Sequence, residues 1–215
     1  TKNYFGSGTG HVMGRNGWGT GDTFAFFLAG PYGQSHAAQQ QGCFLLYNGN
    51  FLTASGNIWS HTGINQGVNC NNVLCFRTSA NAIIPQSAGT ATNSVTLNND
   101  GGFVATANLK PIISNATVTS WNRTATFNAT AHQLRVQDSY ATTSGTTATF
   151  QFVVPSLPTV SGNTITCGDL RAVVSTPASP TINVVNMTSV DSDFQSGYRV
   201  DVSGASGSFD VTFYV

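Results

Sequence analysis

The chain contains no glutamate and only two lysines, Lys2 and Lys110, among its 215 residues. Glutamate and lysine are strong helix formers, so their near absence removes most of the residues that usually build helices. Threonine, valine and phenylalanine, which favour strands, are plentiful, and asparagine, serine and glycine supply the turn positions. The sequence therefore predicts an all-β fold.

Short apolar segments bounded by turn residues recur along the whole chain. Phe24–Ala29 and Cys43–Tyr47 are typical, and Asn48-Gly49, a strong hairpin signal, follows the second. We expect strands at residues 12–15, 23–28, 42–47, 51–54, 72–77, 83–86, 103–107, 112–113, 118–121, 125–129, 133–138, 147–154, 164–167, 170–174, 181–185, 198–202 and 208–215. Short strands in this number, without a helical pattern, predict a large antiparallel β-sandwich.

No linker and no internal repeat divides the chain. We therefore expect a single β-sandwich domain over residues 11–215. Residues 1–10 are rich in glycine and are expected to form a flexible N-terminal segment, unless Tyr4 and Phe5 anchor it.

The last strand carries four apolar side chains on one face, Phe209, Val211, Phe213 and Val215. Such a strand pairs either within its own sheet or with a neighbouring molecule. The formal net charge of the chain is zero, which weakens repulsion between copies. We therefore predict a self-assembly strand here, through which the chain forms a homo-oligomer or homopolymer by its edge strands.

The low charge excludes several classes of partner. Charged residues make up 7% of the chain and form no basic patch, so nucleic acid binding has no electrostatic support. No apolar run is long enough for a membrane span. No signal peptide is visible, so we expect Thr1 to be a mature or processed end.

Sequons and cysteines indicate an extracellular or cell-surface location. N-glycosylation sequons occur at Asn115, Asn122, Asn128 and Asn186, three of them close together. The four cysteines, Cys43, Cys70, Cys75 and Cys167, allow three pairings and contain no C-x-x-C motif. In an oxidising compartment we expect one or two disulfides, with buried thiols as the alternative.

Several motifs occur in an order that carries a family resemblance. They are Arg15-x-x-Trp18, Phe24-x-Phe26, Ala29-Gly30, Ser35-His36-x4-Gln41-Gly42-x-Phe44-x-x-Tyr47, Leu52-x-Ala54-Ser55-Gly56, Asn71-Asn72-Val73-Leu74, Trp121-Asn-Arg123, Leu134-Arg-Val-Gln-Asp138 and Phe150 to Pro155. Together they resemble the C-terminal β-domain of heparinase II/III-like polysaccharide lyases, and the resemblance spans most of the chain.

The resemblance implies a role for His36. In that family a histidine at this place faces the substrate cleft and helps to bind or neutralise the uronate beside the bond that is broken. β-Elimination needs a base and charge stabilisation for the carboxylate. Family members also draw essential residues, including the catalytic tyrosine, from an α/α-toroid domain that these 215 residues do not include. His36 is thus a catalytic candidate, with a structural loop histidine as the alternative.

The resemblance also bears on zinc. Many relatives hold this ion at positions that match Ala38, Ala54 and either Cys70 or Asn71 here. Alanine has no donor atom, so two of the three ligands are missing. We therefore predict no metal and no other cofactor.

The remaining aromatic and titratable residues give weaker signals. Tyr32, Trp59 and His61 are candidate sugar contacts on loops. Trp18 and Trp121 are expected to fill the core, and His11 and His132 to lie on the surface. Asp22 and Asp138 have no carboxylate partner at a recognisable spacing, so a glycosidase pair is not supported.

Three functions remain open. The first is a non-catalytic extracellular glycoprotein scaffold that self-assembles into a filament or surface layer. The second is the β-domain or subunit of a lyase that acts on an acidic polysaccharide and needs a separate toroid domain. The third is a carbohydrate-binding module. The missing ligands favour the first, so we expect no independent enzyme activity.

Overall fold

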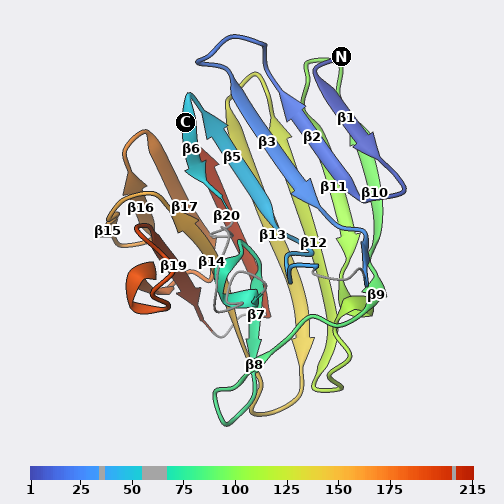
Figure 1. Ribbon diagram of the computed structural model, residues 1–215, viewed down its shortest axis with the longest axis vertical. Helices are drawn as coiled ribbons and strands as arrows, with labels where there is room; N and C mark the ends of the chain where they lie inside the picture. Colours follow the sequence, from blue (N-terminus) through green and yellow to red (C-terminus); the bar gives the residue numbers. More distant parts are fainter. Residues whose placement is uncertain (34–36, 55–66, 205–206) are drawn as a thin grey trace.

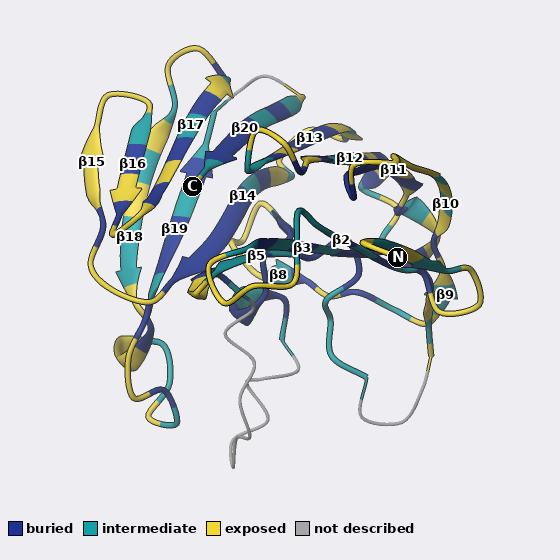
Figure 2. Ribbon diagram, turned by 90° about the horizontal axis from the view of Figure 1, so that it is seen from above, coloured by how far each residue is buried: buried dark blue, intermediate teal, exposed yellow. Residues whose placement is uncertain are grey.

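The computed structural model describes residues 1–33, 37–54, 67–204 and 207–215. Within these ranges the chain consists of strands joined by turns and three short 3-10 helices, η2 (Val68–Cys70), η3 (Lys110–Ile112) and η4 (Met187–Ser189), with no α-helix. The strands form two facing layers (Figures 1 and 2). The predicted all-β sandwich of antiparallel strands is confirmed.

One layer is a single eight-stranded sheet, which we call the large sheet. Its strand order is β10-β11-β12-β13-β20-β17-β16-β15. The strands are β10 (Thr92–Leu97), β11 (Phe103–Asn108), β12 (Val118–Asn128), β13 (Gln133–Thr142), β20 (Ser208–Tyr214), β17 (Leu170–Thr176), β16 (Thr164–Cys167) and β15 (Thr159–Ser161). Two segments expected as separate strands, 118–121 and 125–129, are continuous in β12.

The other layer contains two five-stranded sheets. The first, which we call the N-terminal sheet, has the order β1 (Asn3–Gly6), β2 (His11–Arg15), β3 (Thr23–Leu28), β5 (Phe44–Asn48) and β6 (Asn50–Thr53). The second has the order β18 (Thr181–Asn186), β19 (Tyr198–Ser203), β14 (Thr147–Val154), β7 (Leu74–Arg77) and β8 (Ile83–Ile84). A small pair, β4 (Pro31–Tyr32) with β9 (Gly89–Thr90), lies beside them. In Figure 2 the N-terminal sheet faces β11, β12 and β13.

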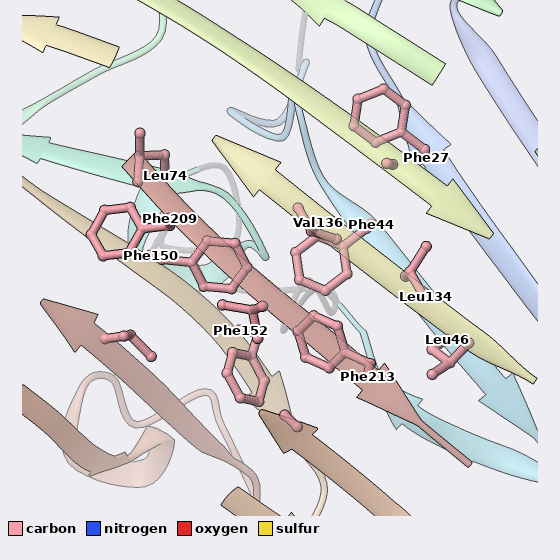
Figure 3. Packing of buried hydrophobic residues seen from close by; sticks show 14 of the residues in the cluster. Phe27, Phe44, Leu46, Leu74, Leu134, Val136, Phe150, Phe152, Phe209 and Phe213 are labelled. Atoms are coloured by element: carbon pink, nitrogen blue, oxygen red, sulfur yellow. The ribbon is translucent and has the colours of Figure 1, made fainter. Parts of the chain in front are cut away.

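Alternate residues of the facing strands point between the layers and form one core (Figure 3). Phe213 of β20 packs against Phe44 of β5, with ring centroids 5.1 Å apart, and against Phe152 of β14 at 5.0 Å. All three rings are completely buried. Since burying a phenylalanine contributes about 1.5–3 kcal/mol, each of these rings stabilises the contact between the layers.

The C-terminal strand is not an edge strand. β20 pairs with β13 on one side and with β17 on the other. Phe209, Val211 and Phe213 are buried in the core, and Val215 just beyond the strand is 37% exposed. The predicted self-assembly strand is therefore wrong, because its hydrogen-bonding edges and its apolar face are both used inside the chain.

A buried ion pair fastens the centre of the large sheet. Arg123 on β12 and Asp138 on β13 lie directly opposite each other and form a two-pronged contact, with Nη2 to Oδ2 at 2.6 Å and Nε to Oδ1 at 2.8 Å. Trp121 Nε1 also donates to Asp138 Oδ1, at 2.8 Å. Asp138, which has no carboxylate partner at a recognisable spacing in sequence, is thus paired with an arginine in the fold.

The N-terminal segment and Trp18 differ from expectation. Residues 3–6 form β1, in which Tyr4 and Phe5 pair with β2, so the segment is anchored, which was the alternative to the flexible end that we expected. Trp121 fills the core as predicted, but Trp18 is 70% exposed. Of residues 112–113, expected as a strand, Ile112 ends the 3-10 helix η3 and Ile113 follows it.

The four cysteines form no disulfide, although all of them lie in the described part of the chain. Cys43 and Cys75 lie in one small apolar cluster, and Cys70 lies in another with Met187 and Phe194. The structure thus contains buried thiols, the alternative to the disulfides that we expected.

Two of these thiols, Cys70 and Cys75, are expected to react slowly in the folded chain. Burial raises the pKa of the Cys70 and Cys75 thiols from 9.0 to about 11. At pH 8 only about one molecule in a thousand carries the reactive thiolate at either site. An aromatic disulfide reagent should therefore label neither residue quickly in the native chain and should count four thiols after denaturation without reductant. A count below four would indicate that the chain contains a disulfide.

The same shifts give a pH dependence. A thiol whose pKa is raised by folding binds its proton more tightly in the folded state than in the unfolded one. Its contribution is complete below about pH 9 and is lost as the pH rises towards about 11. The free energy of unfolding is therefore expected to fall over this window.

Candidate functional site

A pocket of about 390 Å³ opens where the chain leaves β3 and turns into β4. It is lined by Gly8, Thr9, His11, Leu28, Pro31, Tyr32, Ala37, Ala38, Gln40 and Gln41. The lining mixes amide, hydroxyl and imidazole groups with small apolar side chains. We call it the Tyr32 pocket.

A glycine fixes the strand that delivers His11 to this pocket. Gly10 has a φ of +73°, and a Cβ there would lie 2.0 Å from the carbonyl oxygen of Ala29. Only glycine allows this close approach. The Ala29 N–H donates to Gly10 O at 3.0 Å, which closes β2 onto the end of β3. His11 consequently begins β2 opposite Leu28.

Two glutamines hold the other wall in place. The buried Gln41 side chain accepts from Gly30 N at 2.7 Å and donates to Pro31 O at 3.3 Å. Gln86 accepts from Gln41 N at 2.9 Å and donates to Gln41 O at 2.8 Å. These bonds satisfy the polar groups of a buried loop, so the wall is preorganised rather than loose.

The pocket contains two titratable side chains among its described residues, Tyr32 and His11. Burial raises the pKa of the Tyr32 phenol, so this group stays protonated at neutral pH and acts as a hydrogen-bond donor rather than as a base. The His11 ring lies against Phe26, with centroids 5.5 Å apart. The described part of the pocket is therefore suited to binding hydroxyl groups and apolar ring faces.

The sequence-predicted site residues fall into two groups. Tyr32 lines the pocket, and so does Ala38, one of the positions that match a zinc ligand in the relatives. His36, Trp59 and His61 lie outside the described residues, so their predicted roles stay predictions. His36 immediately precedes the pocket residue Ala37 in sequence.

The side chains at the zinc-matching positions do not fit this ion. Ala38 and Ala54 offer no side-chain donor, and Cys70 is fully buried in an apolar cluster that raises the pKa of its thiol to about 11. A thiol must lose its proton to bind zinc, which this burial opposes. In the described ranges no three histidines, cysteines or aspartates are grouped as ligands. The described residues therefore offer no zinc site of this kind, and the absence of a cofactor stays a prediction.

Sequence reasoning missed His11 and Gln41 as members of the pocket. His11 was expected only as a surface histidine, and the structure places it half-buried against Phe26. A usable signal existed, because His11, Met13 and Arg15 alternate along β2 and must share one face. Sequence reasoning also missed the contact between Arg15 and Trp18, which lies at the other end of the same face.

The fold matches solved polysaccharide lyases over the whole chain. A heparinase III structure superposes with a TM-score of 0.78 at 12% identity, covering 99% of this chain and 35% of that protein. A heparan sulfate lyase from Pedobacter heparinus superposes with a TM-score of 0.74 at 17% identity, covering 100% of this chain and 36% of that protein. No family model and no curated protein matches the sequence.

These matches establish the fold and leave the activity open. The chain spans about a third of the length of the lyases that it matches, as one domain of a larger protein would. In the described ranges, no helix has the length and apolar character that crossing a membrane requires. The resemblance to heparinase-type lyases is confirmed for the fold, and this chain has the β-sandwich architecture that forms one part of heparinase III.

Proposed function

We propose that this chain is a glycan-binding β-sandwich domain that works within, or beside, a larger protein of the polysaccharide lyase type. The observation that carries the proposal is the superposition of the whole chain on one third of heparinase III. The Tyr32 pocket is the proposed contact with the polysaccharide.

The chemistry of the pocket supports a sugar ligand. A protonated phenol, the Gln40 amide and an imidazole offer donors and acceptors for hydroxyl groups, while Leu28, Pro31 and the alanines offer an apolar wall. His36, whose sequence neighbour Ala37 lines the pocket, is proposed to contact the uronate in a lyase reaction. A base from another part of the protein is then needed to complete β-elimination.

The sequons are compatible with a ligand on the N-terminal sheet. Asn122 and Asn128 are exposed on β12, where the neighbouring Trp121, Arg123 and Phe127 point into the core. Glycans at these two positions project from the outer face of the large sheet, away from the N-terminal sheet. An extracellular glycoprotein is accordingly part of the proposal.

A self-assembling scaffold stays a hypothesis, although the strand on which it rested is buried. Electron microscopy of the native material addresses it directly. Regular filaments of this chain alone would favour the scaffold over the lyase-type domain.

Binding of polysaccharides tests the proposed pocket. Tyr32→Ala is expected to weaken binding to an acidic polysaccharide about tenfold, which corresponds to about 1.4 kcal/mol, because a donor and a ring face are lost together. Isothermal titration calorimetry measures this. Tyr214→Ala is the matched control, since this half-buried tyrosine lies on the outer face of the large sheet. Equal affinities for both variants, or flat titrations for the wild type, would contradict the proposal.

A further inference from the structure

Two aromatic side chains of the N-terminal sheet and one in the turn between β2 and β3 are exposed, away from the Tyr32 pocket. Trp18 is 70% exposed, Tyr4 is 60% exposed and Phe51 is 56% exposed. They are the only aromatic residues among the seven large apolar side chains that are exposed in the described chain. Their grouping on one sheet therefore calls for an explanation in terms of a ligand or partner.

The strand register places Tyr4, opposite Met13, and Phe51 on the outer face, and Trp18 packs there against the Arg15 side chain. Arg15 on β2 pairs with Phe24 on β3, Phe24 pairs with Tyr47 on β5, and Tyr47 pairs with Phe51 on β6. Directly paired residues point to the same face of a sheet. The inward face of β2 is taken by the buried Val12 and Gly14, so this row faces outward.

A hollow of about 190 Å³ lies at the β1 side of this row. Lys2, Tyr4, Met13, Arg15, Trp18 and Phe24 contribute to its lining. The Arg15 guanidinium carbon lies 4.0 Å from the centre of the Trp18 ring and 5.9 Å from that of Phe24. We call this hollow the Trp18–Arg15 site.

No described carboxylate neutralises the cations of this hollow. Arg123, Arg135 and Arg199 form ion pairs with aspartates. Arg15 and Lys2 pair with no carboxylate among the residues that the structure describes. The Nε of Arg15 is moreover buried without a hydrogen-bond partner. A buried donor without an acceptor is costly, so an anion that reaches Arg15 has a ready partner.

This combination selects one chemical class of ligand. Indole and phenol rings stack on the apolar faces of sugar rings, and a guanidinium binds a carboxylate or sulfate through paired hydrogen bonds. A purely apolar partner would cover the rings but leave the two cations buried without counter-charges, which is costly. We infer that the Trp18–Arg15 site binds an acidic sugar residue, a uronate or a sulfated sugar, of a polysaccharide chain.

The site lies in line with the Tyr32 pocket. His11 lines that pocket and Arg15 lines this site, and both point outward from β2. Four residues of strand separate them, a distance of about 13 Å at 3.3 Å per residue. Met13 lies between them on the same face. An extended oligosaccharide that lies along β2 reaches both sites. Only this joint binding rests on the proposed function of the Tyr32 pocket.

Binding and fluorescence of the whole chain test the site. The Trp59→Phe variant is the background, because it leaves the exposed Trp18 and the buried Trp121 as the only indoles. Hyaluronan and heparan sulfate fragments are the acidic probes, and dextran of similar length is the neutral one. Acidic fragments are expected to change the Trp18 emission and to bind more weakly as salt is raised.

Variants separate this site from the pocket. Trp18→Ala and Arg15→Gln are each expected to weaken the binding of acidic fragments about tenfold, and Arg15→Lys is expected to restore part of this affinity. Leu157→Ala is the control and is expected to leave the affinity unchanged, because Leu157 is 66% exposed but lies outside both sites. Loss of affinity in Tyr32→Ala alone would overturn the Trp18–Arg15 site. Loss in Trp18→Ala alone would overturn the pocket and uphold the site. The inference is overturned if Trp18→Ala and Arg15→Gln both bind acidic fragments as tightly as the background variant does, or if dextran binds with equal affinity. The first of these results is expected if this face contacts a protein domain instead of a sugar.

Discussion

Asp138→Ala is expected to lower the free energy of unfolding by about 3–5 kcal/mol. The substitution leaves the Arg123 guanidinium, whose side chain is 0% exposed, without its counter-charge. It also removes the acceptor of Trp121 Nε1. Replacing one partner of a buried ion pair is far more costly than replacing both, because the remaining charge stays out of water. Denaturant-induced unfolding measures the change.

The exposed pair on the neighbouring strands is the matched control. Arg135 on β13 and Asp210 on β20 form a similar two-pronged contact, but the Arg135 side chain is 47% exposed. Asp210→Ala is therefore expected to cost less than about 1 kcal/mol, because water replaces the lost partner. Similar losses in the two variants would show that the Arg123–Asp138 pair is solvated, contrary to the structure.

The buried pair also connects the large sheet to the candidate site. Arg123 Nη1 donates to Gly42 O at 2.7 Å and to Asn72 O at 3.2 Å. Gly42 follows Gln41, which forms the wall of the Tyr32 pocket. One arginine thus ties together the centre of the large sheet, the loop before β5 and the segment before β7. We expect Asp138→Ala to disturb this loop even where the rest of the fold survives.

Local periodicity was enough to find most strands. Residues 23–28 and 147–154 were expected as strands and have these bounds in β3 and β14, because apolar side chains between turn residues are a local signal. β1 was missed because its glycine-rich surroundings resemble a free end. Its pairing with β2 depends on a partner that a local pattern does not show.

The buried ion pair was within reach of the sequence but needed the hairpin register. β12 ends at Asn128 and β13 begins at Gln133, and these two residues pair. Counting back from that turn places Arg123 opposite Asp138. Trp18 had no such signal, since a tryptophan among glycines is compatible with either a core or a surface position. Its exposed position depends on Arg15, whose side chain points outward from β2 and packs against the indole.

The place of the last strand shows where local patterns stop being informative. The alternating apolar residues in Ser208–Tyr214 are compatible with a central strand and, equally, with an edge strand that joins a neighbouring molecule. The choice depends on β13 and β17, which lie far away in sequence and flank β20 in space. Strand order is a property of the whole sheet, so the sequence pattern alone favoured the wrong alternative.

Phe213→Ala tests this placement and is expected to destabilise the isolated chain by about 3–5 kcal/mol. The ring is completely buried and lies within 6.5 Å, centre to centre, of Phe44, Phe150 and Phe152. Its removal leaves a cavity between two layers whose rigid strands cannot close around it. Thermal and denaturant unfolding of the monomer measure the loss.

Val215→Ala is the matched control from the same end of the chain. Val215 continues the alternation of Phe209, Val211 and Phe213, but it lies beyond the strand and is 37% exposed. Its truncation is expected to change stability by less than about 0.5 kcal/mol. A strand donated to a neighbour predicts the opposite pattern, in which Phe213→Ala abolishes association and leaves the monomer as stable as before. The monomer's stability therefore decides between a strand that holds the sandwich together and one that joins copies of the chain.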